Sequence, residues 1–139
     1  MTAIVKDGFI YGVDGHGPAD NAFVCLNLKT GEEAWRKEVE VEGTVDTPDG
    51  PRKRKLGMAR ASLLLLADGR FLCLGEYGHL LLLELTPQGY KEVARCWPFA
   101  AGESWTLPVL SHGLLYVNQN TRDSVRDRGQ RVWCFDLRK

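Results

Sequence analysis

A short pattern that occurs three times constrains the fold of this chain more than any other feature of its sequence. Each copy is an apolar segment, a tight turn that ends in glycine, and a second apolar segment, over residues 4–11, 65–72 and 109–116. Two of the turns contain Asp-Gly, a strong hairpin signal because glycine tolerates the positive φ that such turns require. The pattern therefore predicts three β-hairpins, repeated along the chain as in a repetitive architecture.

Further strands follow each predicted hairpin. Third strands are predicted at residues 23–28, 80–85 and 132–137, each with a polar residue before its final leucine. Fourth strands are predicted at residues 34–39 and 90–95. No long stretch shows the 3.6-residue periodicity of an amphipathic helix. The sequence thus predicts an all-β fold of antiparallel sheets, two with four strands and the last with three.

The spacing of the turn glycines gives the size of the repeating unit. Gly69 and Gly113 are 44 residues apart, which matches the ~40–45 residues of a four-stranded propeller blade. Gly8 and Gly69 are 61 residues apart, and the surplus is assigned to a surface loop inserted between the first two units. The predicted boundaries are about 3–40 for the first unit, 41–57 for the inserted loop, 58–99 for the second unit and 102–139 for the third.

The segment from Cys25 to Trp35 contains a motif. Thr30 and Gly31 suit a turn between the third and fourth strands, and Trp35 offers a large aromatic surface for packing against a neighbouring unit. The segment resembles the tryptophan-docking motif of the PQQ-like, quinoprotein-type β-propeller repeat family, whose pattern is Ala-x-Asp-x-x-Thr-Gly-x-x-x-Trp. Cys25 stands in place of the alanine of that pattern and Asn27 in place of its aspartate.

A partial second copy of this motif lies in the third unit, where Asp136 corresponds to Asn27. The second unit keeps the architecture without the motif. The resemblance implies a single propeller domain over residues 1–139 with about three blades, similar to the C-terminal portion of a larger propeller. It also implies a periplasmic or exported protein, whereas residues 1–6 lack the features of a signal peptide.

Residues 104–109 resemble the opening of the innermost strand of a blade in this family. Innermost strands line the central channel of a propeller, where ligands bind. Trp105 is therefore a candidate for a residue that faces the channel and a ligand. The alternative for Trp105, as for Trp97 and Trp133, is a packing role between sheets.

The four cysteines form no Cys-x-x-Cys pair and no zinc-binding spacing. Cys25, Cys73 and Cys134 each lie in an apolar, strand-like segment. We expect them to be small buried hydrophobic residues, as free cysteines usually are. A disulfide between Cys25 and Cys134 is the alternative.

Charge and composition restrict the classes of partner. Lys plus Arg and Asp plus Glu are 18 each, so the net charge is zero and no global field favours binding to nucleic acid. The basic run at 52–55 is interpreted as part of a solvated loop. No apolar run approaches the ~20 residues of a membrane-spanning helix. Residues 14–20 contain one histidine and two aspartates, but their glycines and proline favour a loop over a metal site.

The sequence contains no nucleophile–base arrangement and no phosphate-binding loop. The dehydrogenases of the resembling family use an eight-bladed ring, a channel-bound quinone, a calcium ion and a catalytic aspartate, and three blades cannot close such a ring. We therefore expect no catalytic residue, cofactor or metal.

The predicted function is a non-catalytic scaffold that binds a protein or peptide. The alternative is the cofactor-binding portion of a PQQ-dependent oxidoreductase. Expected partners also include the remaining blades of the same propeller or a second copy in a homo-oligomer, because an open wedge of blades exposes apolar faces and sheet edges.

Overall fold

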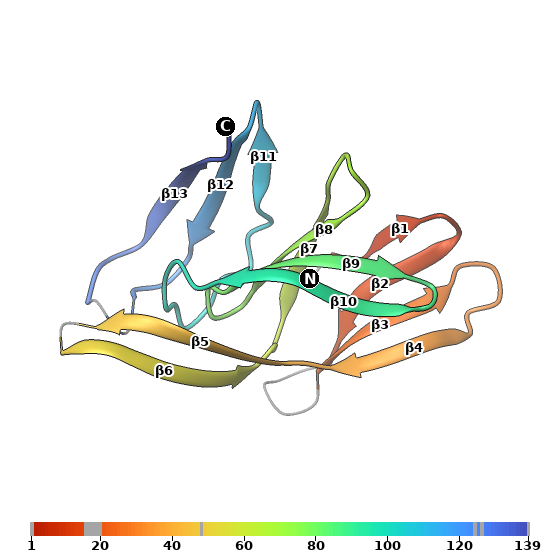
Figure 1. Cartoon of the computed structure of the whole chain (residues 1–139), viewed down its shortest axis with the longest axis horizontal. Coiled ribbons are helices and arrows are strands. Elements are labelled where there is room, and N and C mark those ends of the chain that lie inside the picture. Colours follow the sequence, from red (N-terminus) through yellow and green to blue (C-terminus); the bar gives the residue numbers. More distant parts are fainter. Residues whose placement is uncertain (1, 16–20, 48, 124, 126, 139) are drawn as a thin grey trace.

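The structure of the chain is a computed structural model that describes residues 2–15, 21–47, 49–123, 125 and 127–138. These residues form strands and turns without a helix (Figure 1), so the described chain has no helix that could cross a membrane. The described strands make four antiparallel sheets. This arrangement confirms the predicted all-β class.

Three of the sheets are meanders in which each strand pairs with the next along the chain. The first contains β1 (Ile4–Lys6), β2 (Phe9–Asp14), β3 (Ala22–Asn27) and β4 (Glu33–Glu38). The second contains β7 (Ala61–Leu65), β8 (Phe71–Gly75), β9 (Leu80–Thr86) and β10 (Gly89–Cys96). The third contains β11 (Val109–Ser111), β12 (Leu114–Gln119) and β13 (Arg131–Asp136).

The hairpin turns follow from the φ angles that their residues adopt. Asp7 and Gly8 have φ values of 51° and 81°, and His112 and Gly113 have 51° and 76°. Positive φ at both central positions defines the type I′ turn, whose twist matches that of the flanking strands. The second hairpin has a wider turn in which Gly69, with φ of 84°, is the positive-φ residue. All three predicted hairpins are therefore present.

The fourth sheet is a two-stranded ribbon made of β5 (Glu40–Thr47) and β6 (Gly50–Gly57). It occupies the segment that the sequence suggested was an inserted loop. Opposite charges meet across its strands, with Lys55 Nζ 2.6 Å from Glu40 Oε2 and 3.8 Å from Glu42 Oε1. Such cross-strand pairs favour strand pairing. The basic run at 52–55 is thus one strand of a charged ribbon rather than a loop.

Two apolar cores hold the three meanders together. Between the first and second sheets, the rings of Tyr11 and Phe71 have centroids 5.2 Å apart, and Phe23 lies 5.2 Å from Tyr90. The second core, between the second and third sheets, contains these buried residues: Leu74, Leu80, Phe99, Ala101, Leu115 and Val117. Because side chains alternate along a strand, the second sheet contributes one face to each core.

The other face of the third sheet is uncovered by the described residues. Tyr116, Val132 and Cys134 on this face are all exposed. The expectation of a buried Cys134 is therefore wrong, because no sheet formed by the described residues packs against its side of β13. Cys25 and Cys73 are buried as expected. All four cysteines are free thiols, so Cys25 and Cys134 form no disulfide.

Candidate binding site around Trp105

The motif at residues 25–35 forms the turn between β3 and β4. Asn27 Oδ1 accepts hydrogen bonds from the backbone N–H groups of Lys29 (2.9 Å) and Thr30 (3.1 Å). Gly31 adopts a φ of 75°, and its N–H donates to the carbonyl of Asn27 over 2.8 Å. An amide side chain that accepts two backbone hydrogens stabilises a turn in this way. These residues therefore have a structural role.

Cys25 and Trp35, which pair across β3 and β4, extend from this turn toward the second sheet. Cys25 is fully buried, and Trp35 packs against the core between the two sheets. Asp136 makes a corresponding hydrogen bond in the third sheet. Its Oδ1 accepts from the Arg138 N–H (3.0 Å) as Asn27 does from Lys29. The predicted motif residues thus mark corresponding corners of two sheets.

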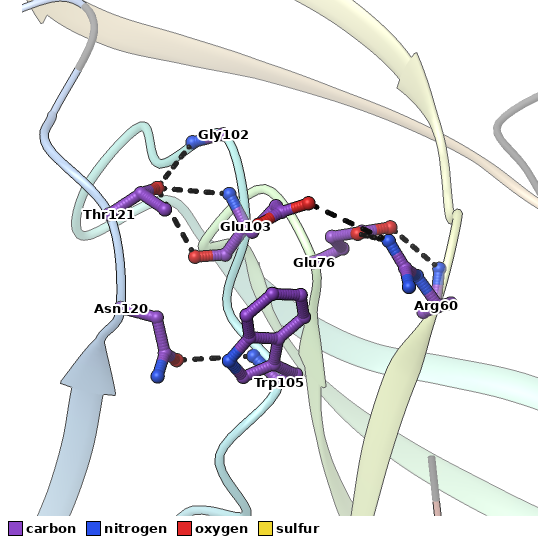
Figure 2. Close-up of polar contacts among 7 residues, drawn as sticks. All are labelled: Arg60, Glu76, Gly102, Glu103, Trp105, Asn120 and Thr121. Carbon is purple, nitrogen blue, oxygen red and sulfur yellow. Dashed lines mark hydrogen bonds and ion pairs between the residues drawn. The ribbon is translucent and has the colours of Figure 1, made fainter.

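Trp105 differs from the other tryptophans because it is on the surface. It lies in the segment before β11 and is 52% exposed, whereas Trp97 and Trp133 pack against the two cores. The guanidinium carbon of Arg60 lies 5.8 Å from the centroid of its indole ring. A cation at this distance is attracted to the ring face. Figure 2 shows the two side chains next to each other, with acidic groups nearby.

The segment that carries Trp105 is held by polar side chains at the end of β12 (Figure 2). Thr121 Oγ1 accepts the backbone N–H groups of Gly102 and Glu103, each over 3.0 Å. Asn120 Oδ1 accepts the backbone N–H of Trp105 over 3.2 Å. These bonds hold the backbone around Trp105, so the exposed indole is attached to an ordered support rather than a free loop.

The side chain and the backbone of Arg60 are both held by Glu76. The Glu76 side chain is only 7% exposed and forms an ion pair with the Arg60 guanidinium. Its Oε2 also accepts the Arg60 backbone N–H over 3.2 Å, and the Glu76 N–H donates to the Arg60 carbonyl over 2.8 Å. The hydrogen bond that the Arg60 guanidinium donates to Glu76, followed by the negative charge of Glu76, raises the pKa of Arg60. Glu103 lies further away, with its Oε1 3.9 Å from the same guanidinium.

The site thus consists of the exposed indole of Trp105, the Arg60 guanidinium beside it, and the carboxylate of Glu103 near that guanidinium. Tryptophan and arginine are residue types enriched in protein interfaces. Among the described residues, no group of three or more His, Cys, Asp and Glu side chains lies close enough to hold a metal ion. The candidate metal loop at 14–20 lies mostly outside the described residues, which exclude 16–20.

Sequence reasoning identified Trp105 and missed the residues that support it. These are Arg60, Glu76, Glu103, Asn120 and Thr121. Arg60 precedes the first strand of the second sheet, as Trp105 precedes that of the third, so a comparison of these two positions could have found it. The polar sequence 118–121 at the end of an apolar strand is a second usable signal. Glu76 had no local signal, because only the fold brings it to Arg60.

His79 is a polar residue that is fully buried inside the protein. Its Nε2 is 3.1 Å from Met58 Sδ, and its ring meets the edge of Trp97 with centroids 5.5 Å apart. Nδ1 is buried and has no hydrogen-bond partner in the described structure. Burial, followed by the charge of Arg95, lowers the pKa of His79 to about 4. His79 is therefore a neutral packing residue at neutral pH.

Comparisons with known proteins do not assign the chain to a family. No protein-family model matches it, and a search of curated proteins finds no similar sequence. The geometry of the chain must therefore support any functional assignment.

Proposed function

We propose that the chain is a partial β-propeller of about three PQQ-like blades, which serves as a non-catalytic module for binding a protein or peptide. The three meanders stacked face to face support the blade interpretation (Figure 1). The hydrogen bond from Trp35 Nε1 to the Thr86 carbonyl, which joins the first two sheets, supports it as well.

The observation that supports binding is the exposed Trp105 on its hydrogen-bonded base. β1, β7 and β11 are the first strands of their sheets, and the first strand of a propeller blade faces the central channel. Trp105 precedes β11 and Arg60 precedes β7, which supports a position at the channel side for both residues in the proposed propeller. Tryptophan and arginine are among the residue types that most often dominate the binding energy of protein interfaces.

The chemistry of the site fits a peptide with an apolar anchor and polar flanks. The indole of Trp105 offers apolar area, while Arg60 and Glu103 present opposite charges close to it. An aromatic or aliphatic side chain of a peptide would lie on the indole. Backbone groups and charged side chains on either side would then face Arg60 and Glu103.

A peptide-array screen followed by titration tests this function. Peptides that bind the wild-type chain should bind Trp105→Ala about tenfold or more weakly, as expected for an aromatic anchor. Leu107→Ala is the matched control, because Leu107 is an exposed apolar residue two positions away. Peptides that bind both variants equally would refute a role for Trp105. Tight binding of a quinone with calcium would instead favour the oxidoreductase alternative.

The exposed face of the third sheet supports a homodimer as part of the same proposal. Tyr116 pairs with Cys134 in the third sheet as Tyr11 pairs with Cys25 in the first. Tyr11 and Cys25 are buried because the second sheet covers them, whereas Tyr116 and Cys134 have no such cover among the described residues. A second copy that covers this face with its first sheet would close a six-bladed ring with two-fold symmetry.

Sedimentation velocity tests the dimer at micromolar concentration. The mass obtained for the wild-type chain should be twice the monomer mass of 15.6 kDa. Val132→Glu on the third sheet and Val5→Glu on the outer face of the first should both give monomers, since both valines are exposed. Val93→Glu changes an exposed valine of the second sheet and should leave the dimer intact. A soluble wild-type monomer would refute the dimer.

A further inference from the structure

Two corresponding leucines in the second and third sheets differ sharply in exposure. Leu85 is the penultimate residue of the third strand of the second sheet and is 1% exposed, whereas Leu137 follows the third strand of the third sheet and is 55% exposed. Leu85 pairs with Tyr90 of β10, the fourth strand of its sheet. The described part of the third sheet has no fourth strand, so the outer edge of β13 is unpaired there. The exposure of Leu137 therefore follows from an uncovered position beside β13.

An apolar groove of about 430 Å³ lies at this uncovered position. Leu82 and Ala94 of the second sheet line it, together with Phe135, Leu137 and Leu110 of the third-sheet region. The groove is continuous with an interface within the protein, because its lining residues Leu80, Leu115 and Phe135 also belong to or pack against the core between the second and third sheets. It is the outer end of that interface, left open.

The corresponding position between the first and second sheets is filled. There, Tyr90 of β10 packs against Phe23 of the first sheet, with ring centroids 5.2 Å apart. Its hydroxyl is buried, and the ring packs against the core of that interface. A fourth strand thus fills the outer end of an interface by inserting one aromatic side chain. The chain itself shows what kind of occupant the open groove would accept.

We propose that the edge of β13 and this groove form a binding site for an extended peptide strand of a second protein. The strand adds antiparallel to β13, so that its backbone pairs with the free N–H and C=O groups of that edge. One large apolar side chain, opposite Leu137, enters the groove as Tyr90 stands opposite Leu85. Alternate side chains of the strand point away from the groove, because side chains alternate along a strand.

The site is independent of Trp105. Trp105 lies before β11, whereas Leu110 of the groove lies within that strand, and Leu137 donates its N–H to the carbonyl of Gly113 in the turn that follows β11. The third sheet can therefore bind a strand at β13 whether or not a peptide binds at Trp105. Loss of one activity by mutation need not affect the other, and this separates the two proposals in experiment.

A peptide with the sequence of residues 89–95, which begin β10, is the probe for this site. A fluorescein-labelled copy should bind the 139-residue chain with a saturable rise in anisotropy. The same peptide with serine in place of its tyrosine should bind about tenfold or more weakly, because a large apolar side chain no longer leaves water. Hydrogen exchange on the complex should show new protection in β13.

Leu137→Glu tests the groove in the protein, and Leu28→Glu is its matched control. Both leucines follow the third strand of a sheet and are about equally exposed, at 55% and 50%, so neither change should unfold the chain. Leu137→Glu should weaken peptide binding about tenfold or more, and Leu28→Glu should leave it unchanged. Equal binding by both variants would overturn the proposal.

Two other results would also overturn it. Protection of β4 or β10 instead of β13 would mean that the peptide adds to any open edge, so the groove would have no role. A dimer of the chain that Leu137→Glu dissociates, and that the peptide displaces, would mean that a second copy fills the groove.

Discussion

Trp35 of the first sheet donates its indole N–H to the backbone carbonyl of Thr86, which ends β9 of the second sheet, over 2.7 Å. The same ring lies 6.4 Å from that of Tyr11, between centroids, and packs against the core that both sheets share. One side chain therefore joins the sheets through an apolar contact and a directed hydrogen bond. The N–H group makes the hydrogen bond across the interface, and the ring packs against the buried residues of the shared core.

Two substitutions of Trp35 should separate these contributions. Trp35→Ala removes the ring and should lower the free energy of unfolding by about 3 kcal/mol or more, as truncations of packed aromatics do. Trp35→Phe keeps most of the apolar contact and should cost about 1 kcal/mol, mainly through the lost hydrogen bond to Thr86. Urea unfolding measures both, with exposed Trp105→Ala as control. A loss below about 1 kcal/mol in Trp35→Ala would contradict an interface role.

Stability should fall in mild acid because of His79. Burial lowers its pKa to about 4 in the folded state, whereas the unfolded chain has a histidine pKa near ~6.5. Between these values the unfolded chain binds the proton more readily, so stability is lost as the pH falls from about 6.5 to about 4. The full difference corresponds to about 3 kcal/mol. Urea titrations at several pH values measure this dependence.

The variant His79→Gln isolates this contribution, since carboxylates also titrate near the lower end of the range. Asp68 and Asp136 both have lowered pKa values through hydrogen bonds from Arg70 and Arg138, and their effect remains in the variant. The slope between about pH 6.5 and 4 should become shallower in His79→Gln than in the wild-type chain. Equal slopes in the two proteins would show that His79 is accessible to protons when folded.

The sequence predicted those parts of the fold that depend on local chemistry. Asp7-Gly8 predicted a hairpin, and the structure shows positive φ at both positions, as in a type I′ turn. The β5–β6 ribbon was missed because its basic run looked like a solvated loop. The partners Glu40 and Glu42 that pair with Lys55 lie more than ten residues earlier in the chain. The exposure of Cys134 was missed for another reason: an apolar strand has the same pattern whether or not a second sheet covers it.

The candidate site was predictable in part for similar reasons. Trp105 was found from its place before an apolar strand, which is a local pattern. Its partner Arg60 lies just before the first strand of another sheet, and Glu76, just after β8, reaches Arg60 only through the pairing of β7 with β8. A contact between side chains of different strands depends on register, which single-sequence patterns specify poorly. The three-stranded last sheet was predicted from the sequence, but the groove beside Leu137 also depends on how the second and third sheets pack, which the sequence did not specify.

Gly75 should not tolerate a side chain, because His79 fills the space beside it. A Cβ atom on Gly75 would lie 1.9 Å from Nε2 of His79, and the His79 side chain is fully buried. Gly75→Ala should lower the free energy of unfolding by about 1–3 kcal/mol, as overpacked cores do. Gly129→Ala is the control, since nothing lies within 4 Å of its Cβ position. Thermal unfolding compares the two, and an unchanged midpoint in Gly75→Ala would mean that His79 can move away.

Thr121 should act as a positioning residue for Trp105 through its hydroxyl. Its Oγ1 accepts the N–H groups of Gly102 and Glu103, at 3.0 Å each, and contacts the Glu103 carbonyl at 3.3 Å. Thr121→Val keeps the shape and removes all three bonds, so the amides of Gly102 and Glu103 should exchange with solvent faster, and stability should fall by about 1–2 kcal/mol. Thr121→Ser keeps the oxygen and should restore slow exchange. Hydrogen exchange followed by NMR measures the amides individually. Fast exchange in Thr121→Ser as well would show that the methyl group, and not the hydroxyl, orders the segment beneath Trp105.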